Sequence, residues 1–217
     1  MNNNLVEIVF LIDASGSMQP LRQETISNFN RFIEKQRLEP TKANVTIYTF
    51  NYLLFKIIEQ KDIQLLNLSE DWYIPGGQTA LLQASCQAID AVGKRLADLP
   101  EALRPGKVIF VTITDGQENY SSSFYTGELL AEKIKHQQDV YKWGFLYLGA
   151  NQDSYTVANK YGYKVETISN YQPTRAGTTN LFVSLGETIS TFRTTLSNKG
   201  NADISISPDI KTKLENK

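Results

Sequence analysis

The fold of this chain follows from residues 6–18, which read Val6-Glu7-Ile8-Val9-Phe10-Leu11-Ile12-Asp13-Ala14-Ser15-Gly16-Ser17-Met18. The segment from Val6 to Ile12 is apolar except for Glu7, and a run of this length and composition predicts a β-strand. The segment from Asp13 to Ser17 is small and largely polar, as expected for a loop. The stretch therefore predicts a strand that ends in a loop rich in side-chain oxygens.

Further apolar runs alternate with segments of helical spacing along the rest of the chain. The runs lie at Val45 to Phe50, Lys107 to Ile113, Trp143 to Leu148 and Lys164 to Ile168. This alternation predicts parallel strands joined by right-handed helical crossovers, with helices on both faces of the sheet. The expected fold is therefore α/β, doubly wound and Rossmann-like.

One connection departs from the parallel pattern. Only Asn51-Tyr52 separates the run that ends at Phe50 from the next, Leu53 to Ile58. Two residues are too few for a crossover, so these two strands should form an antiparallel hairpin, which we expect at an edge of the sheet.

The domain organisation follows from length and from the last periodic segment. At 217 residues the chain is long enough for one domain. A final helix is expected within Thr178 to Thr195, and beyond it the apolar pattern fades to Ile204, Ile206 and Ile210. We therefore expect one domain at residues 1–196 and a polar C-terminal tail at 197–217, flexible or dependent on a partner.

The composition narrows the classes of partner and compartment. Lysine and arginine total 22 against 23 acidic residues, so no overall charge favours nucleic acid or a membrane surface. Cys86 is the only cysteine and the start of the sequence lacks the features of a signal peptide. We expect a cytoplasmic protein that binds neither nucleic acid nor membrane.

Oxygen-bearing side chains are expected at one edge of the sheet. Asp13, Ser15 and Ser17 occupy alternate positions after the first strand, with Gly16 between them to relieve backbone strain. Asp115 follows the strand Lys107 to Ile113. Ligands of an open parallel sheet bind beyond the carboxyl ends of its strands, so both carboxylates should face one point.

A third loop completes this set of oxygens. Thr79 lies in the segment Pro75-Gly76-Gly77-Gln78-Thr79-Ala80, where the glycines permit a tight turn just before a helix. The set contains no nitrogen or sulfur ligand, which favours Mg²⁺ or Mn²⁺ over Zn²⁺. The sequence therefore predicts a divalent-metal site formed by Asp13, Ser15, Ser17, Thr79 and Asp115.

These five residues, in this order, resemble the metal-ion-dependent adhesion site of von Willebrand factor type A domains, and the chain is similar to the intracellular bacterial or phage-like type. The resemblance spans roughly residues 5–196 and implies a six-stranded sheet of order 3-2-1-4-5-6. It also implies that Ser15 and Ser17 bind the metal directly, while the other three bind directly or through water. The function expected on this basis is a metal-dependent, non-catalytic protein-binding module.

The partner of such a module can be described chemically. Two carboxylates balance the charge of a divalent cation, and hydroxyls add no charge, so the site still accepts an external carboxylate. We therefore expect a protein partner that supplies an Asp or a Glu to the metal.

Three alternatives compete with this interpretation. The first is a Mg²⁺-dependent phosphatase or phosphotransferase that resembles haloacid-dehalogenase-like enzymes, but that chemistry needs an acid at position 15, where this chain has serine. The second is a structural domain that binds no metal. The third is that Asp13 caps a helix and Asp115-Gly116 forms only a turn.

Several other polar residues have more than one interpretation. Asn151 and Asp153 should lie on the rim of the metal site and contact a partner, or Asp153 caps a helix. Glu118 and Asn119 either support the metal ligands or belong to a solvated turn. His136 is expected to face solvent, and Cys86 is expected to be a buried structural thiol.

Overall fold

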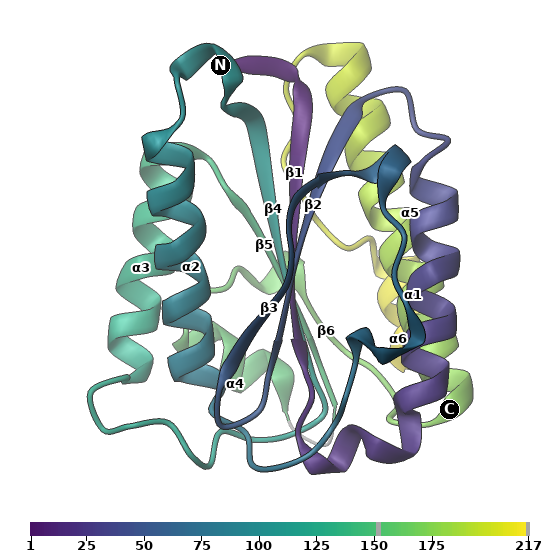
Figure 1. Ribbon diagram of the computed structural model, residues 1–217, viewed down its shortest axis with the longest axis vertical. Helices are drawn as coiled ribbons and strands as arrows, with labels where there is room; N and C mark the ends of the chain where they lie inside the picture. Colours follow the sequence, from purple (N-terminus) through teal and green to yellow (C-terminus); the bar gives the residue numbers. More distant parts are fainter. Residues whose placement is uncertain (151–152, 216–217) are drawn as a thin grey trace.

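The computed structural model describes residues 1–150 and 153–215, which form a central sheet between two layers of helices (Figure 1). The strand order is β3-β2-β1-β4-β5-β6, and neighbouring strands are parallel except β2 and β3. The strands are β1 (Asn2–Asp13), β2 (Lys42–Phe50), β3 (Leu54–Asp62), β4 (Pro105–Thr114), β5 (Gly144–Gly149) and β6 (Ile168–Asn170). This confirms the predicted doubly wound sheet with one antiparallel edge strand.

Helices cover both faces of the sheet, as predicted. One face carries α1 (Arg22–Gln36), α5 (Arg175–Lys199) and α6 (Pro208–Glu215); the other carries α2 (Leu81–Asp98), α3 (Gly127–Tyr141) and α4 (Ser154–Lys160) (Figure 1). Short 3₁₀ turns span Gly16–Leu21, Ile63–Leu65, Glu70–Trp72, Glu101–Leu103 and Val165–Thr167. None of the helices in the described part of the chain is both long enough and apolar enough to cross a membrane.

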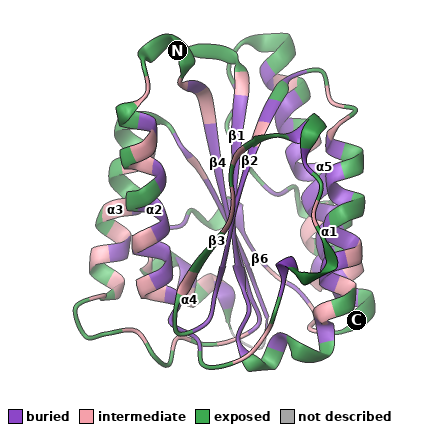
Figure 2. Cartoon of the chain, viewed as in Figure 1, coloured by how far each residue is buried: buried purple, intermediate pink, exposed green. Residues whose placement is uncertain are grey.

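The core has two halves because successive side chains of a strand point to opposite faces. In β1, Phe10 and its even-numbered neighbours face α1 and α5, whereas Val9 and Leu11 face α2. Phe10 makes edge-to-face contacts with Phe29 and Phe32 of α1, with ring centroids 5.0 and 5.4 Å away. Figure 2 shows the result, a sheet that is buried along almost all of its central strands.

The last strand lies later in the chain than the sequence predicts. Residues 165–167 form a 3₁₀ turn, and β6 begins only at Ile168, where it pairs with the end of β5. The prediction of a strand over Lys164 to Ile168 was therefore wrong. Val165 and Ile168 are three residues apart, a spacing that fits one 3₁₀ turn rather than the alternation of a strand.

The C-terminal segment packs against the domain instead of extending away from it. After α5, Gly200 adopts a left-handed conformation (φ 70°) and reverses the chain. Ala202, Ile204 and Ile206 then alternate into the core, and α6 contacts α5 and β6. This differs from the expected flexible tail, because these scattered apolar residues fall on one side of an extended segment.

Candidate metal site

The register of the sheet places the two predicted carboxylates at one edge. Ile12 in β1 lies opposite Ile113 in β4, so Asp13 and Asp115 emerge from adjacent parallel strands. Thr114 connects the two loops, because its hydroxyl donates a 2.6 Å hydrogen bond to Oδ2 of Asp13. The juxtaposition expected from the sequence is therefore present in the structure.

The two serines continue this chain of contacts from one acid to the other. The backbone N–H of Ser15 donates to Oδ1 of Asp13 at 2.7 Å, and the hydroxyls of Ser15 and Ser17 are 3.1 Å apart. Ser17 Oγ then donates to Oδ1 of Asp115 at 2.7 Å. Ser15 is buried and Ser17 is exposed, so the contacts run from the end of the sheet to the surface.

Thr79 reaches the same point from a third loop. A Cβ atom added at Gly116 would lie 3.2 Å from Oγ1 of Thr79 and 3.8 Å from Oδ2 of Asp13, so these two oxygens approach the same position. Backbone bonds hold the loop in place: Gly76 N–H donates to Ala14 O at 2.8 Å, and Gly16 N–H donates to Gly77 O at 2.9 Å. The structure thus brings all five predicted residues together.

The environment of the two carboxylates disfavours negative charge. Burial raises the pKa of Asp13 to about 6, against hydrogen bonds from Thr114 and Ser15 that lower it, and the nearby charge of Asp115 raises it further. Burial also raises the pKa of Asp115, while its hydrogen bond from Ser17 acts in the opposite direction. A cation placed between the two acids would stabilise their ionised forms.

The donor set fits a hard divalent cation. It consists of two carboxylates and three hydroxyls, and Mg²⁺ and Mn²⁺ prefer such all-oxygen surroundings. Among the described residues, no group of three or more His, Cys, Asp or Glu side chains lies close enough together to hold a metal.

The fold and the sequence agree on a family. The sequence matches the family model of the von Willebrand factor type A domain over residues 7–169. This chain belongs to that family. Among curated proteins, none matches the sequence.

Several solved structures share the fold at low sequence identity. Proximal thread matrix protein 1 from the mussel byssus, with a zinc-occupied MIDAS motif, has TM-score 0.56 and 18% identity over 85% of this chain and 46% of its own. Manganese-loaded TRAP protein of Plasmodium vivax has TM-score 0.54 and 21% identity over 84% of this chain and 75% of its own. The vWF domain of the type V pili tip protein Mfa5 of Porphyromonas gingivalis has TM-score 0.58 and 11% identity over 86% of this chain and 95% of its own. The chain thus spans less than half the length of the mussel protein.

Two residues that the sequence left open support the ligand loops of this von Willebrand A domain. Asn119 exchanges two bonds with Thr79, accepting from its N–H at 2.9 Å and donating to its carbonyl at 3.0 Å. Glu118 accepts from the N–H of Leu82 at 2.8 Å and so caps the start of α2. Asn119 thus contacts the predicted ligand Thr79, whereas Glu118 contacts the start of α2, and support of a metal by either residue stays a prediction.

Three further residues that support the site were not predicted from the sequence. Thr114 holds Asp13, Tyr73 donates its hydroxyl to the carbonyl of Asp13 at 2.6 Å, and Asn51 donates to the carbonyl of Gly76 at 2.8 Å. Thr114 could have been found, because it directly precedes Asp115 at the end of a strand. Tyr73 and Asn51 could not, since their contacts depend on how loops fold over the sheet.

Of the glycines predicted to shape the site, Gly77 has a left-handed backbone and Gly16 does not. Gly77 has φ +82°, and a Cβ there would lie 2.7 Å from Cδ1 of Tyr52. Gly16 has no positive φ, and its Cβ would make an ordinary contact at 3.4 Å. The prediction that Gly16 relieves backbone strain was therefore wrong, and Gly77 has that role in the Thr79 loop.

The remaining polar predictions have simple outcomes. Asp153 caps α4 through Thr156 N–H at 3.2 Å, which confirms the cap, whereas Asn151 lies outside the described residues. His136 is exposed and Cys86 is buried, both as predicted. Burial raises the pKa of the Cys86 thiol to about 11, which makes it a poor nucleophile near neutral pH.

Proposed function

We propose that this von Willebrand A domain is a divalent-metal-dependent protein-binding module whose Mg²⁺ or Mn²⁺ accepts an Asp or Glu of a partner protein. The observation that carries the proposal is the convergence of five oxygen-bearing side chains from three loops at one edge of the sheet. When bound, the cation would supply positive charge and a coordination position for an external carboxylate.

The residues of the chain have distinct tasks in this proposal. Asp13 and Asp115 balance the charge of the cation, and the three hydroxyls add oxygen donors without further charge. Asn119 and Thr114 hold Thr79 and Asp13 in position. The zinc-occupied motif of the mussel protein and the manganese-loaded Plasmodium protein support a metal in this fold, at sequence identities that show the fold alone.

Exposed apolar side chains near the metal loops support a protein partner. Tyr52 lies against Gly77 of the Thr79 loop, and its ring meets that of Tyr120 edge-to-face at 6.2 Å between centroids. Ile74 and Phe124, which flank the same loops in sequence, are each 71% exposed. Aromatic residues are enriched at protein interfaces, so a partner would bury this apolar rim around its acidic residue.

The alternative phosphatase gains no support from the site. Domains of this family are usually non-catalytic binding modules. The leaving-group acid that haloacid-dehalogenase-like chemistry needs would occupy position 15, but Ser15 is there, and its hydroxyl contacts Ser17.

Thermal unfolding with and without metal tests the proposed site. Mg²⁺ at about 100 times its dissociation constant should stabilise the domain by about 2.7 kcal/mol, which raises the Tm by roughly 5 to 10 °C. The shift should be much smaller in Thr79→Ala and in Ser15→Ala. Thr194→Ala, an exposed threonine of α5, is the matched control and should keep the full shift. An equal shift in all variants would place the metal elsewhere.

An affinity pull-down then tests the partner. The protein is presented to cell lysate in Mg²⁺, in chelator, and as Thr79→Ala, and the retained proteins are identified by mass spectrometry. A partner retained only with metal and with Thr79 supports the module. Identical retention in all lanes would contradict a metal-dependent interface, even if Mg²⁺ still raises the Tm.

A further inference from the structure

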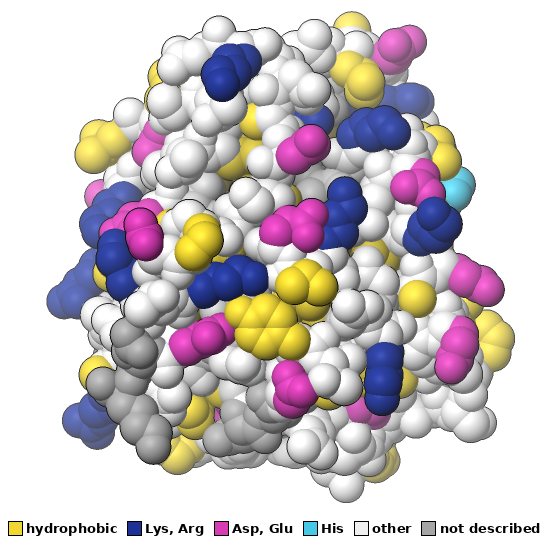
Figure 3. All heavy atoms as spheres, turned by 180° about the vertical axis from the view of Figure 1, so that it is seen from behind, with side chains coloured by type: hydrophobic (Ala, Val, Ile, Leu, Met, Phe, Trp, Pro, Cys, Tyr) yellow, Lys and Arg dark blue, Asp and Glu magenta, His cyan; other side chains and the backbone are white. Residues whose placement is uncertain are grey.

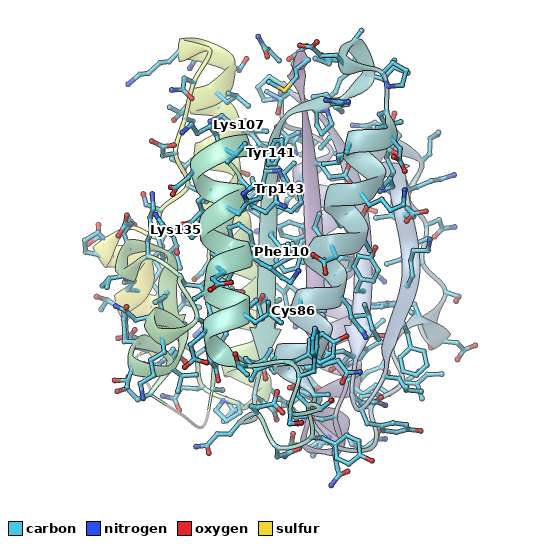
Figure 4. All side chains as sticks on the ribbon, turned by 90° about the vertical axis from the view of Figure 1, so that its left-hand side faces the viewer. Cys86, Lys107, Phe110, Lys135, Tyr141 and Trp143 are labelled. Atoms are coloured by element: carbon cyan, nitrogen blue, oxygen red, sulfur yellow. The ribbon has the colours of Figure 1, made fainter. Side chains whose placement is uncertain are left out.

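A second candidate ligand site lies at the amino-terminal ends of the parallel strands, opposite the loops that carry the candidate metal ligands. A hollow of about 660 Å³ opens between the last turns of α2 and α3 and the first residues of β4. Figure 4 shows Lys107, Tyr141 and Trp143 grouped at this end of the space between the two helices, away from Cys86. Sites for small molecules typically measure about 300 to 1,000 Å³, so this hollow has the size of such a site.

The hollow has an apolar floor and a more exposed apolar wall. Leu96, Val108 and Trp143 are almost fully buried and line its base. Val140 and Tyr141 stand beside them with more than half of their surface exposed, at 56% and 57%. Large apolar side chains that the fold leaves half uncovered next to a concave floor favour a ligand with an alkyl or aromatic body.

The charges at the rim are unbalanced. Of the lysines and acids that line the hollow, Lys94 pairs with Asp98 at 2.7 Å, and Asp90 pairs with Lys133 at 2.6 Å. In residues 1–150 and 153–215, no salt bridge engages the other three cations at the rim, which are Arg104, Lys107 and Lys142.

Of these three cations, Lys107 is the one best placed to bind a ligand. Arg104 donates to the carbonyls of Leu99 and Ala97 at the end of α2, and Lys142 donates to the carbonyl of Asp139 at the end of α3. The side chains of Arg104 and Lys142 are therefore partly engaged by carbonyl groups at helix C-termini, which carry partial negative charge. Lys107 has no such bond within the described chain, and it lies at the start of β4 beside the apolar floor.

We propose that this hollow binds a small amphipathic anion, a carboxylate on an alkyl or aromatic body. The apolar body would lie on Trp143 and Val108, and the carboxylate would meet the ammonium of Lys107, with Arg104 and Lys142 adding to the positive field. A purely ionic ligand such as phosphate would leave the apolar floor uncovered. The chain as a whole has 22 basic and 23 acidic residues, and the face in Figure 3 mixes both signs of charge.

This site is separate from the proposed metal site. The hollow lies at the first residues of β4, Pro105 to Val108, whereas Asp115 follows its last residue. Ten residues of strand separate the two ends, a distance of about 30 Å. Neither binding event needs the other, so each proposal can fail alone.

Trp143 provides a direct readout of binding. The chain has two tryptophans, and Trp72 lies in the other half of the core against Phe29. Titration of Trp72→Phe with decanoate should change the fluorescence of Trp143 and saturate. Decyltrimethylammonium, which carries the same alkyl chain with a positive head group, should produce no saturable change. Calorimetry of decanoate binding to the unmodified chain measures the same event if Trp72→Phe does not fold.

Two variants test separately the charge of Lys107 and the volume of the hollow. Lys107→Gln should weaken decanoate binding roughly tenfold or more, as expected for the loss of a charge-assisted contact, whereas Lys35→Gln on the exposed face of α1 should not. Gly93→Leu should abolish binding, because Gly93 lines the hollow from α2 and a leucine side chain there would occupy it; a Cβ at this position would lie 3.3 Å from Nε2 of Gln137. Ala91→Leu, on the exposed side of α2, is its control.

Three results would overturn the proposal. They are an equal response to the anion and the cation, equal affinities in Lys107→Gln and Lys35→Gln, and retained binding in a folded Gly93→Leu. Addition of a chelator should leave decanoate binding unchanged. A loss of decanoate binding in chelator would show that the two sites are coupled and would contradict their independence.

Discussion

Gly77 is the residue whose backbone conformation most directly shapes the candidate metal site. Its φ of +82° costs about 1–2 kcal/mol for any residue with a Cβ, and that atom would also clash with Tyr52 at 2.7 Å. Gly77→Ala should therefore lower the free energy of unfolding by about 1–3 kcal/mol in urea denaturation. It should also weaken Mg²⁺ binding, because Gly77 belongs to the loop that carries Thr79.

The neighbouring glycine is a matched control for this prediction. A Cβ at Gly76 would meet nothing within 4 Å, and its φ is not positive. Gly76→Ala should be neutral or stabilise by up to about 1 kcal/mol, since alanine restricts the unfolded chain. If the two variants lose equal stability, the left-handed conformation of Gly77 does not shape the loop.

Glu7 predicts a pH dependence of stability that is independent of the metal site. Its side chain is fully buried in β1, where Oε1 accepts from Thr46 at 2.6 Å and from Arg95 at 2.7 Å. Burial raises the pKa of Glu7, and the charge of Arg95 only partly opposes this effect. Protonation of Glu7 therefore favours the folded state, so its contribution to stability is complete at low pH and is lost as pH rises through the folded pKa.

A neutral variant measures this contribution. Glu7→Gln does not titrate at position 7, so the free energy of unfolding of the unmodified chain minus that of Glu7→Gln should decrease as the pH rises above about 4.3, the ordinary pKa of a glutamate. Urea denaturation across this range gives the difference, and Glu34→Gln, at an exposed carboxyl of α1, corrects for the loss of one acid. A difference that grows with pH would mean that the ion pair with Arg95 outweighs burial.

At the scale of elements, the C-terminal segment after α5 differs most from what the sequence predicts. Ile204 is buried, and its Cγ2 would lie only 2.5 Å from a Cβ at Gly144, so the segment packs closely over the start of β5. Glu215 fixes the other end, because its Oε1 accepts from the hydroxyl of Tyr155 at 2.7 Å. The segment is therefore packed into the hydrophobic core of the domain.

Truncation of Ile204 tests this integration. Ile204→Ala should lower the free energy of unfolding by about 2–4 kcal/mol, as expected for a buried isoleucine. The exposed neighbour Asp203→Ala should change it by less than about 0.5 kcal/mol. Urea denaturation followed by tryptophan fluorescence gives both values. An unchanged midpoint in Ile204→Ala would show that the segment detaches before the domain unfolds.

At the scale of the whole molecule, the sheet separates the two proposed ligand sites, which lie at opposite ends of its strands. Ligands that bind distant, independent sites stabilise a protein additively, usually within about 0.3–0.5 kcal/mol. Mg²⁺ and decanoate together should therefore stabilise the domain by the sum of their separate effects, measured by thermal unfolding at fixed ligand concentrations. A sum that falls short or is exceeded by more than about 1 kcal/mol would show coupling through the sheet.

Local patterns were sufficient to predict the fold class and the five candidate ligands. The apolar run at Val6 to Ile12 indicates a strand regardless of its neighbours, and two residues between Phe50 and Leu53 exclude a crossover. The alternation of strands and helices then places Asp13 and Asp115 at one edge, because parallel strands end on the same side. These features depend on chain geometry over a few residues.

The remaining features depend on contacts between residues that are distant in sequence. Tyr73 contacts the carbonyl of Asp13 across 60 positions, and a Cβ at Gly77 has no space because Tyr52 packs against that residue. Ile204 becomes buried only because Gly144 leaves room for it, and the hollow beside Lys107 exists only where α2 and α3 both end above β4. Periodicity records which face of an element is apolar, but it contains no information about which distant surface covers that face; packing in three dimensions decides this.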